Sequence, residues 1–132
     1  MIRLTAFLSI LCATLIGCTI PPADNRGAAI YGKYCASCHG TSGRGDGPLA
    51  AEFGGTPADL TLLRQRNDGT FPPEAVMAQI YGYPGRHQFG GMPNFGRELE
   101  GPIADWVTPT GAKISTPQAL IDLTVYLEGI QQ

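Results

Sequence analysis

The sequence has little of several features that mark common protein classes. Its 132 residues include only two histidines and four cysteines, and the net charge at pH 7 is −2. Proteins that bind nucleic acid usually carry a strongly basic surface, so this charge argues against such a partner. A nearly continuous apolar run, Leu4–Ile16, is too short to span a bilayer comfortably. The length suits one domain.

Glycine and proline, in contrast, are abundant, with 18 and 11 residues respectively. This composition indicates short helices joined by long turns and leaves little room for an extended regular sheet. We therefore expect an all-α fold. A small chain of this kind buries little apolar surface by itself, and such domains commonly need a cofactor or a cross-link to hold together.

Two thiols and an imidazole lie within the five residues Cys35-Ala36-Ser37-Cys38-His39. This motif has three interpretations: a thioredoxin-type redox pair, half of a zinc site, or an attachment site for a c-type haem. On a helix, residues three and four apart share a face, so all three side chains can face one flat object. Thioethers could then hold the edge of a haem while the imidazole reaches its iron.

The rest of the chain favours haem over the two alternatives. A thioredoxin-type pair belongs in an alternation of strands and helices that this sequence lacks. A zinc site needs further ligands, and His87 is the only other histidine. The motif therefore predicts one covalently bound haem c, held through Cys35 and Cys38, with His39 as an iron ligand.

The N-terminus is typical of a secretory signal, with Arg3 ahead of the apolar run. The run ends in Leu15-Ile16-Gly17-Cys18, which resembles the bacterial lipobox, where the chain is cut before the cysteine and that cysteine carries lipid. An ordinary signal peptide cut after Gly17 is the alternative. Thr19 is not the aspartate that retains many lipoproteins at the inner membrane, which favours the outer membrane.

These assignments account for all four cysteines. Cys12 would leave with the signal, Cys18 would carry lipid, and the remaining two would bind haem, so no free thiol is left in the oxidising periplasm. We expect a signal peptide at residues 1–17, a lipidated tether at 18–25 and the functional domain at 26–132.

A glycine-rich loop follows the motif, and its residues Gly45-Asp46-Gly47-Pro48 lack the Gly-Lys-Ser/Thr ending of a phosphate-binding loop. Cys-His-Gly followed by Gly-Asp-Gly-Pro resembles the bacterial class I c-type cytochromes. In that family a proline-bearing loop offers a backbone carbonyl to the second nitrogen of the haem-binding histidine. The resemblance places Gly47 and Pro48 in this role.

Met92 lies in a loop between glycines and a proline, whereas Met77 falls in an apolar helical pattern that is typical of a core residue. A Met-Pro loop downstream of the haem motif resembles the loop that supplies the sixth iron ligand in class I cytochromes. The resemblance makes Met92 an iron ligand whose soft sulfur raises the reduction potential. His87, five residues earlier, and an open coordination site are the alternatives.

The last helix is expected to begin at Thr116-Pro117, with Thr116 as its cap. It resembles the C-terminal helix of class I cytochromes, in which the aromatic residue at the position of Tyr126 packs against the first helix. Gly27 and Tyr31 would be its partners. About twenty residues, 96–115, separate this helix from the methionine loop and depart from the compact pattern of the family; Trp106 lies among them.

The resemblance as a whole implies a small cytochrome c-like fold of short helices wrapped around one haem. It implies a membrane-anchored one-electron carrier on the periplasmic side of the cell envelope. Its partners would be redox proteins, with no small-molecule substrate and no enzymatic activity. Two alternatives stay open: a haem c subunit of a larger oxidoreductase, and a haem peroxidase or sensor in which Met92 is displaceable.

Overall fold

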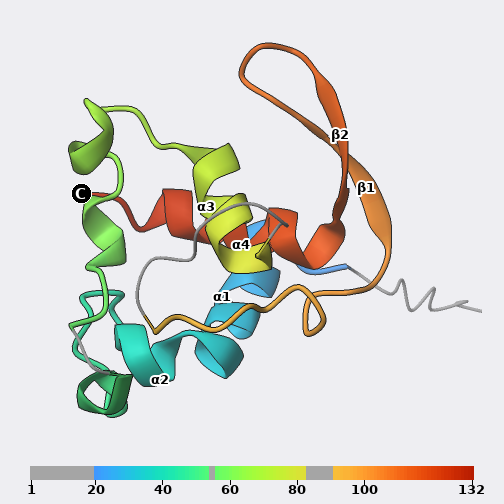
Figure 1. Cartoon of the computed structure of the whole chain (residues 1–132). Helices are drawn as coiled ribbons and strands as arrows, with labels where there is room; N and C mark the ends of the chain where they lie inside the picture. The colour runs from blue at the N-terminus through green and yellow to red at the C-terminus, as the bar shows by residue number, and fades with distance from the viewer. Residues whose placement is uncertain (1–19, 54–55, 83–90) are drawn as a thin grey trace, which may run out of the picture.

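The structure, a computed structural model, describes residues 20–53, 56–82 and 91–132. Its elements, in chain order, are the helix α1 (Ala23–Tyr34), the helix α2 (Ala36–His39), the 3₁₀ turns η1 (Ala50–Phe53), η2 (Leu60–Leu62) and η3 (Gln65–Asn67), the helix α3 (Pro73–Tyr81), the strands β1 (Ile103–Val107) and β2 (Lys113–Pro117), and the helix α4 (Gln118–Gly129). The helices form the body of the domain, and the β1–β2 hairpin projects away from them (Figure 1). No helix among the described residues is long and apolar enough to cross a membrane.

The prediction of an all-α fold is wrong, because residues 103–117 form an antiparallel hairpin. β1 and β2 pair in a register that places Trp106 opposite Ile114. Both strands carry β-branched residues and β1 carries an aromatic one, and these side chains favour extended backbone. The turn between the strands is closed by the backbone N–H of Gly111, which donates to the carbonyl of Thr108 at 2.9 Å. The hairpin lies almost wholly in the segment that departs from the compact cytochrome pattern.

The two terminal helices pack directly against each other at Gly27. A Cβ atom added at Gly27 would lie 2.1 Å from the carbonyl oxygen of Asp122 and 2.6 Å from Cβ of Tyr126. Only glycine therefore allows α1 and α4 to approach so closely. One turn further along α1, the ring of Tyr31 lies 5.2 Å from the ring of Tyr126 at a tilt of 43°. The predicted packing of Tyr126 against Gly27 and Tyr31 is confirmed.

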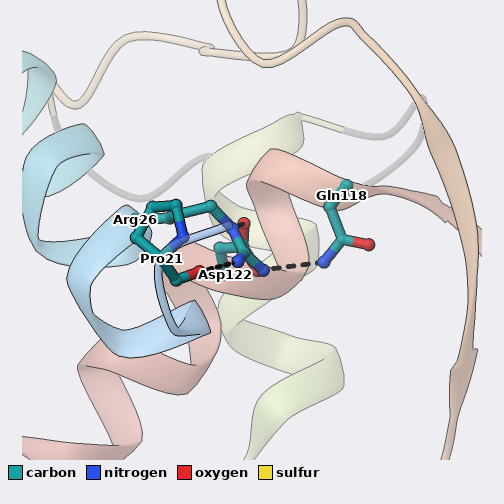
Figure 2. A network of polar contacts seen from close by, with 4 residues as sticks. All are labelled: Pro21, Arg26, Gln118 and Asp122. Atoms are coloured by element: carbon teal, nitrogen blue, oxygen red, sulfur yellow. Dashed lines mark hydrogen bonds and ion pairs between the residues drawn. The ribbon is translucent and has the colours of Figure 1, made fainter. Parts of the chain in front are cut away.

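A buried carboxylate joins the same two helices. Asp122 is 2% exposed, and the guanidinium of Arg26 donates to both of its oxygens, at 2.6 and 2.8 Å. Gln118 donates to the same carboxylate at 2.9 Å, and Arg26 also donates to the backbone carbonyl of Pro21 (Figure 2). Its hydrogen bond with Asp122 raises the pKa of Arg26 above its usual value. This network holds the start of α1, which begins at Ala23 inside the predicted tether, against α4.

The hydrophobic core lies between α1, α3 and α4. Its buried residues are Tyr31, Phe71, Val76, Met77, Ile80, Leu99, Leu120, Leu123 and Leu127. Leu120, Leu123 and Leu127 of α4 are at most 3% exposed. The predicted cap is wrong, since Pro117 occupies the N-cap position and the Thr116 hydroxyl donates to the carbonyl of Ile114 instead.

Tyr31 connects this core to the segment that follows the cysteine motif. Its hydroxyl donates to the backbone carbonyl of Gly40 at 2.6 Å. Burial raises the pKa of Tyr31 well above its usual value, so the phenol remains protonated and continues to donate. The packed interface between α1 and α4 is thereby linked to the end of α2, where His39 lies.

Candidate haem-binding site

The Cys35–His39 motif consists of Cys35, at the junction between α1 and α2, and the short helix α2. Cys35 is both the C-cap residue of α1 and the N-cap residue of α2, with φ −113° and ψ −38°. Its N–H donates to the carbonyl of Tyr31 at 2.9 Å. The N–H groups of Cys38 and His39 both donate to the carbonyl of Cys35, at 3.1 and 2.9 Å. All three functional side chains line one cavity, and both cysteines are free thiols.

The state of the thiols disfavours a redox pair. Burial, together with the neighbouring Cys38, raises the pKa of the Cys35 thiol to about 11. A cysteine that exchanges disulfides needs a lowered pKa, because the thiolate is the reactive form. In the described part of the chain, no three His, Cys, Asp or Glu side chains are placed to hold a metal ion. Neither the thioredoxin-type nor the zinc interpretation finds support here.

The imidazole of His39 is held by the backbone of a distant segment. Its Nδ1 lies 2.9 Å from the carbonyl oxygen of Ala58. A carbonyl can only accept a hydrogen bond, so Nδ1 must carry the proton and Nε2 is left with its lone pair. Nε2 is therefore the ring nitrogen that can bind iron, and the hydrogen bond at Nδ1 fixes the tautomer and the ring angle.

The position of Ala58 depends on the glycine-rich loop and on a capped turn. The N–H of Leu60 donates to the carbonyl of Gly43 at 2.7 Å, which ties the turn to the loop. Asp59 caps η2 by accepting from the N–H of Thr61 at 2.9 Å and from its hydroxyl at 2.6 Å. The side-chain hydrogen bond from Thr61 is the main cause that lowers the pKa of Asp59.

The structure gives Gly47 and Pro48 a different place from the one the resemblance suggested. The backbone carbonyl that accepts a hydrogen bond from the imidazole of His39 belongs to Ala58 and not to this loop. The N–H of Gly47 instead donates to the carbonyl of Cys38 at 3.1 Å, and a Cβ at this position would lie 2.4 Å from the carbonyl oxygen of Ser37. The loop thus supports the backbone of the cysteine motif from outside the cavity.

Met92 lines the same cavity as the cysteine motif, whereas Met77 is 4% exposed and belongs to the core. The chain after Met92 is fixed to the end of α3, because the N–H of Phe95 donates to the carbonyl of Ile80 at 3.0 Å. The thioether of Met92 is therefore placed beside the cavity by backbone contacts. His87, the alternative ligand, lies outside the described residues.

Gln79 is a cavity residue that the sequence did not reveal. It lies on α3 between Val76 and Ile80, which also line the cavity, and its Nε2 is 3.9 Å from the sulfur of Met92. In the sequence, Gln79 is a single amide residue within an otherwise apolar helical segment. Nothing in that pattern says which atom the amide contacts.

The cavity has a volume of about 830 Å³, within the roughly 300–1,000 Å³ of typical ligand and cofactor sites. Its lining is mostly apolar and includes Leu49, Leu60, Leu63, Val76, Ile80 and Phe95. Into this apolar space the chain brings two thiols, an imidazole with one free nitrogen, and a thioether. That donor set fits haem c, which needs two thiols for attachment, a nitrogen and a soft sulfur for iron, and an apolar envelope.

A comparison with protein families agrees with this chemistry. The model of the family described as cytochrome c oxidase, cbb3-type, subunit III matches residues 22–107. The chain belongs to this family. It is therefore a c-type cytochrome, which binds haem c with its iron and transfers electrons. No curated protein shows a significant match to the sequence.

The match covers the part of the cytochrome that forms most of the cavity wall. It runs from just before α1 to the end of β1 and contains both the cysteine motif and Met92. β2 and α4 lie beyond it. Trp106 does not line the haem cavity but a second hollow of about 540 Å³, which it shares with Phe71 and with residues of α4.

Proposed function

We propose that this cytochrome is a one-electron carrier with a single haem c. Cys35 and Cys38 would form the two thioether bonds, and His39 and Met92 would be the axial iron ligands. The observation that carries the proposal is the meeting of these four side chains at one apolar cavity. Haem bound there supplies a reversible one-electron couple.

The residues of the chain set the properties of that couple. The carbonyl of Ala58 holds the imidazole of His39 and makes it a stronger electron donor. The apolar lining excludes water, which disfavours the extra charge of the ferric state. The thioether of Met92 also favours the ferrous state. The apolar lining and the thioether raise the potential, whereas the stronger donation by the imidazole opposes them; the first two contributions favour a carrier of fairly high potential.

A role as an electron-transfer subunit of a larger oxidoreductase is the second candidate. It is favoured by the family match, because the family description names a subunit of an oxidase. Both roles use the same haem and the same ligands, and they differ in whether the redox partner is permanently bound. A peroxidase or gas sensor is disfavoured by Met92, which would occupy the position that a substrate or gas must reach.

The carrier function predicts simple redox and ligand-binding behaviour. A potentiometric titration of the purified holoprotein should follow a single one-electron curve. The ferrous wild type should bind carbon monoxide slowly or not at all, whereas ferrous Met92→Ala should bind it rapidly because its sixth position is open. Rapid binding by the wild type, or turnover of hydrogen peroxide at the rate of the Met92→Ala variant, would favour a peroxidase or sensor.

We further propose that residues 1–17 are a lipoprotein signal and that lipid on Cys18 anchors the domain at residues 26–132 to a membrane facing the periplasm, with the outer membrane favoured. Cys18 lies outside the described residues. Two or more acyl chains give stable anchoring, since each buried methylene contributes about 0.8 kcal/mol. Cells grown with labelled palmitate should incorporate label into the wild type but not into Cys18→Ser. An unlabelled wild type would contradict the anchor.

A further inference from the structure

Gln79 is a polar side chain at the haem cavity that the proposed ligand set does not use. Its Nε2 lies 3.9 Å from Sδ of Met92, within the range for a hydrogen bond to sulfur. An amide N–H is a donor and a thioether sulfur is a weak acceptor, so the direction is settled by chemistry. A thioether has two lone pairs, and one can accept from Gln79 while the other remains for iron.

The backbone places both partners of the contact between Gln79 and Met92. Gln79 is on α3, and the loop that carries Met92 is tied to the C-terminal end of the same helix. The N–H of Phe95 donates to the carbonyl of Ile80 at 3.0 Å, and the amide of Asn94 donates to the carbonyl of Gly82 at 3.4 Å. These bonds hold the loop, whereas the amide of Gln79 reaches the sulfur atom itself.

From this geometry we propose that Gln79 is a positioning residue for the axial thioether and raises the reduction potential of the haem. A hydrogen bond to Sδ restrains the rotamer of Met92 and draws electron density away from the sulfur. A thioether is a soft and weak donor, which is why it favours ferrous iron; the σ-donation that it does make stabilises the electron-poor ferric state, so a hydrogen bond that weakens this donation disfavours the ferric state further. This inference rests on the proposed role of Met92 as a ligand.

The test compares the reduction potential of three holoproteins: wild type, Gln79→Leu and Gln65→Leu. Gln79→Leu removes the donor, and Gln65→Leu makes the same substitution at an exposed position on η3. At the wild-type midpoint, Gln79→Leu should be more ferric by a factor of up to about ten, the limit reached if the whole energy of one hydrogen bond were present only in the ferrous state. For a one-electron couple a tenfold change equals about 59 mV. Gln65→Leu should keep the wild-type potential.

The near-red charge-transfer band of ferric haem with a sulfur ligand separates the possible outcomes. Gln79→Leu should keep the band, at a shifted wavelength, together with a lowered potential. A kept band with an unchanged potential, or an equal shift in Gln65→Leu, overturns the role of Gln79 and leaves the carrier function intact. A wild type without the band overturns Met92 as ligand, and the role of Gln79 with it. If Gln79→Leu fails to bind haem, Gln79→Ala removes the amide donor without adding bulk or charge and should also lower the potential.

Discussion

Replacing both Cys35 and Cys38 by alanine should abolish covalent attachment of haem. The two thiols are free, lie on one helical motif and line the cavity together with His39. After denaturation only thioether bonds can keep haem on the chain, so the double variant should lose its haem stain completely on a denaturing gel. Each single variant should keep a weaker signal through the one remaining bond.

Ser37→Ala is the matched control for this loss. Ser37 lies between the two cysteines on the same helix and also lines the cavity, but it has no thiol to form a bond. The control should keep the full haem signal. A stained double variant would mean that the haem is attached elsewhere, and an unstained wild type would mean that attachment is not covalent.

Gly27→Ala should destabilise the holoprotein by about 2 kcal/mol. Added atoms in a packed core cost about 1–3 kcal/mol and occasionally more. The cost here should be at the upper end, because the new methyl would meet the main chain of Asp122, which cannot rotate away. Alanine recovers about 1 kcal/mol through its better helix propensity. The midpoint of urea unfolding, followed by circular dichroism, measures the difference.

The same helix provides the control. Gly32 is also in α1, and a Cβ added there meets no atom within 4 Å. Gly32→Ala should therefore stabilise the protein by roughly 0.5–1 kcal/mol through helix propensity alone. Equal midpoints for the two variants would contradict the close packing of α1 on α4 at Gly27.

The parts of the site that could be predicted depend on short spacings in the sequence. Cys35, Cys38 and His39 lie within one turn of helix, so their common direction follows from helical geometry alone. Met92 could be singled out because it lies in a loop of glycines and a proline, where a methionine is not needed to fill the core. The contact of Tyr126 with α1 followed from the resemblance, since a glycine inside a helix needs a packing reason.

The parts that could not be predicted depend on contacts between distant segments. The carbonyl on His39 comes from Ala58, nineteen residues away, and any residue type could supply it. The contact of Gln79 with Met92 exists only because a backbone bond places the loop on α3. The hairpin was missed because its strands are short, and the abundance of glycine and proline suggested turns throughout.

The near-red spectrum of the ferric protein tests the central claim most directly. If Met92 is the sixth ligand of a haem held by Cys35, Cys38 and His39, the wild type should show the sulfur-to-iron charge-transfer band. Met92→Ala should lose the band, and Met77→Leu should keep it because Met77 lies in the core. A wild type without the band, or a band that survives in Met92→Ala, would contradict the proposed ligand set and the carrier function that depends on it.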